Sequence, residues 1–85
     1  MMNSQFVAER AQNLAKQILD NASLDSAGRL RALYQKILNR QAMPLEIDGS
    51  LSYIEGFQKR GASLQDAWTS FSRILLASNE YIYLD

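Results

Sequence analysis

Apolar residues recur along this chain at the spacing of an α-helix, first in two segments of its N-terminal half. In the first segment the apolar positions are Val7, Ala11, Leu14, Ala15 and Ile18. In the second they are Leu30, Leu33, Tyr34, Ile37 and Leu38. Residues three and four apart share one face of a helix, so each segment presents a single apolar stripe. The spacing predicts helices over residues 5–21 and 26–39, and Asp25 or Ser26 can cap the start of the second.

Two further helices are predicted in the C-terminal half. Pro44 favours a helix start, because proline is tolerated at a first helical position, and Gly61 favours a left-handed end. The inward positions between them are Ile47, Leu51, Ile54 and Phe57 or Gln58. After a start resembling a capping box at Ser63, a last stripe comprises Leu64, Ala67, Trp68, Phe71, Ile74 and Leu75. These patterns predict helices over residues 44–60 and 64–78, followed by a short C-terminal extension.

The fold class that follows is all-α, a small bundle of four helices forming one domain over residues 1–85. No alternating apolar and polar run long enough for a strand precedes Tyr81. Trp68 is expected at the centre of the bundle, because its stripe is the most apolar of the four. Gly49 and Gly56 weaken the third helix, each by about 1 kcal/mol relative to alanine, so this helix is expected to be the most mobile.

Charge and hydropathy restrict the partners of the chain. Its 85 residues include nine basic and nine acidic side chains, scattered so that the net charge is zero. Nucleic-acid binding is therefore not expected, because such binding needs a concentrated positive face. Membrane insertion is not expected either, because no apolar run approaches the length that spans a bilayer.

The residues that most often carry enzyme chemistry are missing from the sequence. It contains no histidine and no cysteine, and its four glycines form no phosphate-binding loop. The commonest nucleophiles, general bases and transition-metal ligands are therefore absent together. We expect a non-catalytic module that holds no metal and no cofactor.

Four side chains remain as candidates for a special role. Arg40 follows the apolar stripe of the second helix and Glu80 follows that of the fourth, so the two are candidates for a structural ion pair. Solvation of both charges, or an anion site at Arg40, is the alternative. Tyr81 and Tyr83 are a candidate interaction surface, because tyrosine buries a large ring while keeping a hydroxyl for a partner. Core packing of these tyrosines stays open.

Three segments of the chain carry a family resemblance. Residues 2–11 read Met-Asn-Ser-Gln-Phe-Val-Ala-Glu-Arg-Ala, and residues 29–46 read Arg-Leu-Arg-Ala-Leu-Tyr-Gln-Lys-Ile-Leu-Asn-Arg-Gln-Ala-Met-Pro-Leu-Glu. The closing segment 67–85 reads Ala-Trp-Thr-Ser-Phe-Ser-Arg-Ile-Leu-Leu-Ala-Ser-Asn-Glu-Tyr-Ile-Tyr-Leu-Asp. Together they resemble the uncharacterised C-terminal helical domain of large secreted planctomycete proteins that carry an N-terminal cytochrome c-like domain. A shorter likeness extends to helical linker domains of the phycobilisome type.

The resemblance implies a context but no reaction. It implies that the chain is a fragment of an exported, periplasmic or extracellular, protein and packs against other domains of its parent. The family usually has proline at position 5, glycine at 39 and threonine at 43, where this chain has Gln5, Asn39 and Met43. Asn39 must then supply the left-handed residue, and Met43 removes the usual cap.

Two other classes of function stay open from the sequence. One is an extracellular module that binds a carbohydrate or another ligand through its aromatic C-terminal end. The other is a fragment of an enzyme that upstream domains complete, to which this chain would lend Arg40 or Glu80.

Overall fold

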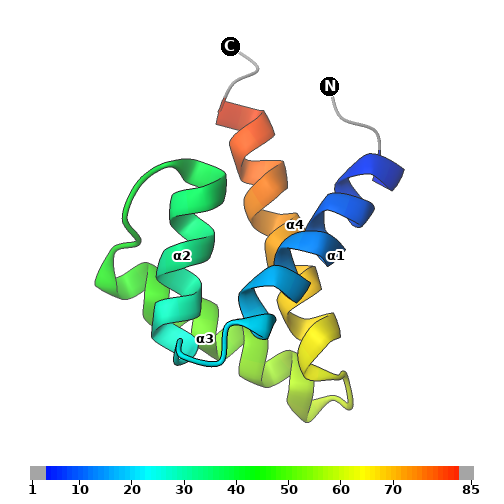
Figure 1. Ribbon diagram of the computed structural model, residues 1–85, viewed down its shortest axis with the longest axis vertical. Coiled ribbons are helices and arrows are strands. Elements are labelled where there is room, and N and C mark those ends of the chain that lie inside the picture. The colour runs from blue at the N-terminus through cyan, green and yellow to red at the C-terminus, as the bar shows by residue number, and fades with distance from the viewer. Residues whose placement is uncertain (1–3, 83–85) are drawn as a thin grey trace.

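The computed structural model describes residues 4–82 of the chain, and side chains from residue 4 to residue 79. It contains α1 (Ser4–Asp20), α2 (Ser26–Leu38), α3 (Pro44–Lys59) and α4 (Leu64–Ile82), joined by short loops (Figure 1). Over this range there is no strand. The all-α fold of four helices predicted from the apolar spacing is therefore confirmed.

The helix boundaries follow from the residues at the turns. Asp25 caps α2, and its Oδ1 accepts a hydrogen bond from the Gly28 amide at 2.7 Å. Asn39 ends α2 in the left-handed region with φ 54°, which asparagine tolerates better than most residues. Gly61 follows α3 with φ 103°, and the Ser63 hydroxyl caps α4 by accepting from the Asp66 amide at 3.0 Å.

The C-terminal end of α4 differs from the prediction. The helix was expected to end at residue 78, with a short extension after it, but it continues to Ile82. The sequence Ser78-Asn79-Glu80 contains neither glycine nor proline. Serine and asparagine disfavour a helix interior by only about 0.5 kcal/mol each, which is too little to stop a helix that is already formed.

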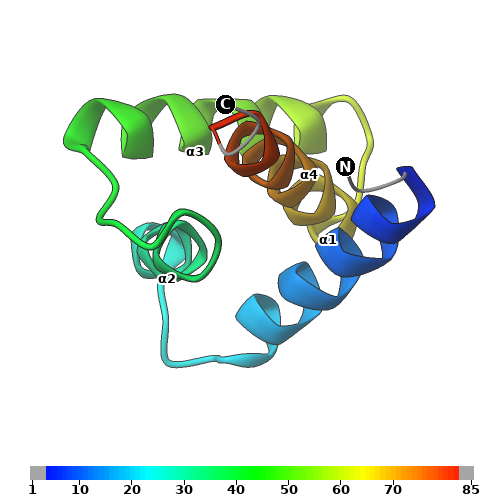
Figure 2. The same cartoon turned by 90° about the horizontal axis from the view of Figure 1, so that it is seen from above.

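The helices are arranged around α4. Helix α4 packs against α1, α2 and α3, and α2 also packs against all the others, whereas α1 and α3 do not pack against each other. Seen from above, α3, α4 and α1 follow one another in an arc, and α2 lies on the inner side of that arc (Figure 2). The outer side of α4, away from α2, is therefore not covered by a helix of the described chain.

One apolar core joins all four helices. Its buried members are Ala11, Leu14, Ala15, Ile18, Leu30, Leu33, Tyr34, Ile37, Ile54, Ala67, Trp68, Phe71, Leu75 and Leu76. Trp68 is only 2% exposed and is the largest of the fully buried side chains, as its stripe predicted. Ser72 is buried among them without cost to its hydroxyl, which donates to the Trp68 carbonyl at 2.8 Å.

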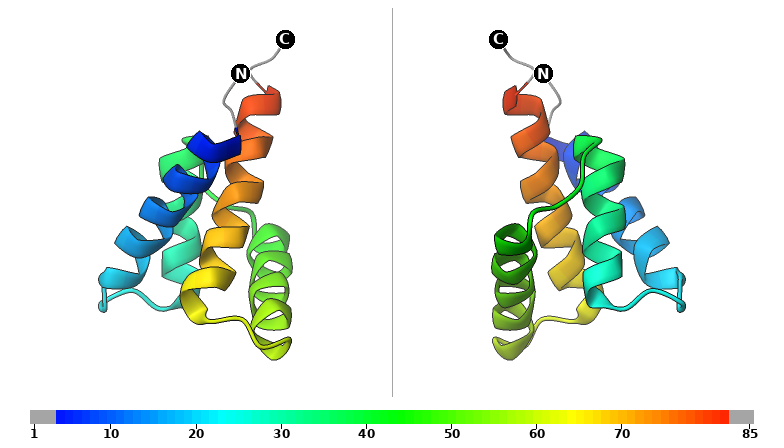
Figure 3. Two further views of the ribbon diagram at one scale, coloured as in Figure 1. Left: turned by 90° about the vertical axis from the view of Figure 1, so that its right-hand side faces the viewer. Right: turned by 90° about the vertical axis from the view of Figure 1, so that its left-hand side faces the viewer.

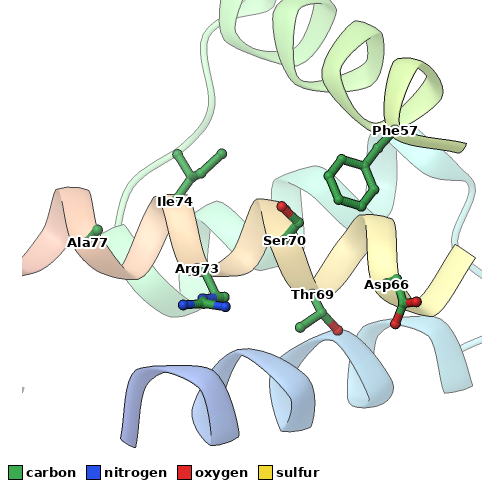
Figure 4. Close-up of a pocket in the computed structure, with 7 residues that line it drawn as sticks. All are labelled: Phe57, Asp66, Thr69, Ser70, Arg73, Ile74 and Ala77. Carbon is green, nitrogen blue, oxygen red and sulfur yellow. The ribbon is translucent and has the colours of Figure 1, made fainter. Parts of the chain in front are cut away.

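Two positions of the predicted stripe on α4 are not buried. Leu64 is 44% exposed and Ile74 is 43% exposed, whereas Leu76 and Ser72 are buried. The prediction assumed one buried face centred on the apolar residues. In the structure the buried side of α4 is the one that packs against α1, α2 and α3, and Ile74 lies at the edge of this side, toward α3 (Figure 4).

The buried indole makes Trp68→Ala the most damaging single truncation that we expect. Removing a fully enclosed aromatic ring leaves a cavity and typically costs about 3 to 5 kcal/mol in the free energy of unfolding. The stability of a domain of this size is only about 4 to 12 kcal/mol, so the variant should be largely unfolded or close to it. Denaturant titration followed by circular dichroism measures the loss. Leu45→Ala is the control, because Leu45 is 84% exposed, and a loss for Trp68→Ala no larger than for this control would contradict the central position of Trp68.

The helical glycines of α3 give a second prediction. A Cβ atom built at Gly49 or Gly56 meets no atom within 4 Å. Gly49→Ala and Gly56→Ala should therefore each raise the free energy of unfolding by about 0.4 to 1 kcal/mol, since alanine loses less backbone entropy in a helix. Gly61→Ala should have the opposite sign, because its positive φ disfavours a side chain. Urea midpoints of the three variants test this, and stabilisation by Gly61→Ala would refute the argument.

Candidate functional site

Arg40 forms a clamp across the turn between α2 and α3. Its two terminal nitrogens donate to the two carboxylate oxygens of Glu46, each at 2.8 Å. The guanidinium also lies over the ring of Tyr34, with its carbon 5.5 Å from the ring centroid. The clamp is open to solvent, since the two side chains are 46% and 32% exposed. Its geometry is that of a structural link between two helices.

Glu46 has a second role at the start of α3. Its Oε1 accepts a hydrogen bond from the Met43 amide at 2.9 Å, and the Met43 side chain makes no cap hydrogen bond. The bonds from Arg40 and then from the Met43 amide lower the pKa of Glu46 to about 2. The hydrogen bond to Glu46 raises the pKa of Arg40. Glu46 thus caps the N-terminal end of α3, in place of a threonine side chain at position 43.

The predicted pair of Arg40 and Glu80 stays a prediction. The Glu80 side chain lies outside the described residues, and the guanidinium of Arg40 is already bound in bidentate fashion by Glu46. The side chain of Tyr81 and the whole of Tyr83 also lie outside the described range. The structure therefore leaves the proposed interaction surface at Tyr81 and Tyr83 untested.

The outer side of α4 carries a shallow groove of about 540 Å³. We call this surface the α4 face and define it by the α4 residues Asp66, Thr69, Ser70, Arg73, Ile74 and Ala77. Phe57 of α3 lines its edge (Figure 4). The left view of Figure 3 shows the same side of the molecule, with α4 between α1 and α3.

The hydroxyl groups of the α4 face are held by hydrogen bonds to neighbouring side chains. The Ser70 hydroxyl is 2.7 Å from the Tyr53 hydroxyl, and the Thr69 hydroxyl accepts from the Gln65 amide at 3.1 Å. No group of three or more acidic, histidine or cysteine side chains that could hold a metal ion occurs in the described part of the chain. What the face offers is exposed Ile74, small side chains and one charge of each sign.

The sequence contains a signal for the α4 face that the search for buried apolar stripes did not reveal. Asp66 and Arg73 are seven residues apart, which places them two turns apart on the same side of a helix. Ile74 lies beside them and was assigned to the core because it is apolar. The sequence does not distinguish an exposed isoleucine from a buried one, because its exposure depends on how the neighbouring helices pack.

The clamp predicts an acid-sensitive contribution to stability. A carboxyl whose folded pKa is lowered stabilises the fold above its unfolded pKa, near 4.5, and the contribution is lost as the pH falls through about 2. Wild type should therefore be more stable than Glu46→Gln at pH 7, and the difference should shrink between pH 4.5 and pH 2. Urea midpoints across this range measure it, with Glu55→Gln as the matched exposed control on the same helix. A difference that does not change with pH would contradict the role of the ionised carboxylate.

Comparison of the chain with protein-family models, with characterised proteins and with solved structures finds no match. No helix among the described residues is long and apolar enough to cross a membrane. The resemblance to the planctomycete C-terminal domain therefore remains a prediction from the sequence segments.

Proposed function

We propose that this chain is a non-catalytic helical module that packs against other domains of a larger exported protein. The observation that carries the proposal is the length of α4, which continues to Ile82 and extends past the ends of α1 and α2 (Figures 1 and 3). Most of the stability of a helix in a protein comes from tertiary packing of one face. A projecting helix end of this kind is suited to receive a partner surface.

The position of the chain ends supports an intramolecular contact. The start of α1 and the end of α4 lie at the same end of the molecule (Figure 1). A domain joined before α1 would therefore enter beside the last turn of α4, where Tyr81 stands in the sequence. The family resemblance implies such a preceding region, since the planctomycete proteins carry their cytochrome c-like domain upstream of the helical one.

The other two classes of function have less support. Trp68 and Phe71 are 2% and 5% exposed, so neither presents a ring on which a sugar could stack. A carbohydrate site at the aromatic C-terminal end would then depend on Tyr81 and Tyr83. A contribution of Arg40 to an upstream active site would require it to release Glu46, which binds both of its terminal nitrogens.

Docking in trans tests the proposed function. The module, labelled with a fluorophore, is added to the remaining domains of its parent at up to about 100 μM, which saturates a micromolar contact. We expect saturable binding that Tyr81→Ser combined with Tyr83→Ser weakens by at least about tenfold, equivalent to roughly 1.4 kcal/mol. The reason is that two large rings are removed from the proposed interface.

Leu45→Ser is the matched control for this experiment. It removes an apolar side chain that is 84% exposed and lies at the start of α3 on a different element. It should leave the binding unchanged. No saturable binding by the wild-type module, or equal effects of the control and the tyrosine variant, would overturn the docking proposal.

A further inference from the structure

We propose that the α4 face binds the α4 face of a second copy of this chain, with the two helices antiparallel. The two-fold axis would pass between Thr69 and Ser70. This self-association is independent of the docking at Tyr81 and Tyr83, which uses the projecting end of α4 and not its outer side.

The charge pattern of the α4 face is self-complementary about that axis. Asp66 and Arg73 are equally far from the midpoint between Thr69 and Ser70, and a helical rise of 1.5 Å per residue separates the two charges by about 10 Å along α4. An antiparallel second copy places its Arg73 opposite Asp66 and its Asp66 opposite Arg73. The contact therefore contains two equivalent ion pairs related by the two-fold axis, as an isologous interface requires.

Both charges are available for such a contact. The ion pair that the described residues form is the one between Arg40 and Glu46, and neither Asp66 nor Arg73 takes part in an ion pair within residues 4–79. Both side chains are exposed on α4. The net charge of the chain is zero, so no general repulsion opposes the approach of a second copy.

The shape of the face permits a close helix pair. The axis lies at Thr69 and Ser70, so the two side chains at the middle of the face are small, and Ala77 lies at its C-terminal end. Packed helices approach to about 8 to 10 Å depending on the side chains between them, and small ones favour the shorter distance. Because α3, α4 and α1 follow an arc with α2 on its inner side, the outer side of α4 is not enclosed (Figure 2).

Ile74 supplies the apolar part of the interface. Its side chain is 43% exposed and projects from the face between Ser70 and Ala77 (Figure 4). It lies on the α3 side of the face, the side that Phe57 lines, so in the antiparallel arrangement it would approach that edge of the second copy. One helix face is smaller than the interface of a stable dimer, so we expect a weak association, with a dissociation constant of about 10⁻⁴ M.

The proposal is tested by reversing each charge of the α4 face in turn and by mixing the two variants. Sedimentation equilibrium between about 10 μM and 1 mM should show dimers of the wild type, a range that brackets the expected dissociation constant. Asp66→Arg places two arginines opposite each other and should sediment as a monomer. Arg73→Asp places two aspartates opposite each other and should do the same. An equimolar mixture of the two variants restores both opposite-charge contacts and should contain heterodimers.

Two further variants separate the specific contact from general charge effects. Asp66→Arg combined with Arg73→Asp exchanges the charges within one chain and should form homodimers again. Arg31→Asp is the control, since Arg31 is exposed on α2, on the other side of the molecule from the α4 face. It should dimerise as the wild type does, and its mixture with Asp66→Arg should form fewer heterodimers than the mixture of the two reversed variants, because one of its two charge contacts is repulsive. Circular dichroism confirms that each variant is folded.

Three results would overturn the inference. The first is that the wild-type chain stays monomeric at every concentration, even if its α4 face is found to bind a different partner. The second is a dimer that survives either single charge reversal. The third is a mixture of the two reversed variants that stays monomeric.

Discussion

The enclosure of Trp68 is the interaction on which the rest of the structure depends. A domain of this size buries only about 60 to 65% of the surface that its unfolded chain exposes, so its core has few members and each matters. The indole is 2% exposed and belongs to a core cluster drawn from all four helices. At about 25 cal/mol per Å² of buried apolar surface, no other side chain of the core contributes as much area. Helices α1, α2 and α3 are where they are because each shields part of the side of α4 that carries it.

Shielding a single helix from one side leaves the opposite side open, and this asymmetry produces the α4 face. Three helices are enough to bury Trp68, Phe71 and Leu75, but they do not reach around to Ile74. A larger domain would cover that side with a fifth helix. Here the uncovered side keeps two apolar side chains, two hydroxyl groups and two opposite charges, which is the composition of a small interface.

Local signals in the sequence determine where the helices begin and end, and most of these boundaries could be predicted from the sequence. The capping oxygen of Asp25, the left-handed Asn39 and Gly61, and the proline at the start of α3 each act within one turn of their own position. The buried stripes were readable as well, because helical periodicity fixes which residues share a side. Trp68 was placed correctly for this reason.

The features that the sequence did not reveal depend on how separate elements approach each other. Glu46 is six residues from Arg40, and the two meet only because the left-handed Asn39 turns the chain back between α2 and α3. A pattern search at helical spacing has no reason to pair them. The exposure of Ile74 has the same origin, since it depends on the arrangement of the neighbouring helices. The extension of α4 to Ile82 is different, because it follows from the local absence of any strong stop.

Helix α3 connects the stability of the domain to the shape of its interaction surface. It buries fewer side chains than α1 or α2, with only Ser50 and Ile54 below the surface, and it carries two glycines in its interior.

Its N-terminal end is fixed by the clamp, and its middle is fixed to α4 by the hydrogen bond between the hydroxyls of Tyr53 and Ser70. Phe57, which lines the edge of the α4 face, lies one turn beyond Tyr53 and packs against its ring, with the centroids 6.0 Å apart. Loosening of α3 would therefore move this edge of the face. The helix that buries fewer side chains than α1 or α2 thus forms part of the surface through which the module is proposed to bind a second copy, so substitutions in α3 are expected to affect both stability and binding.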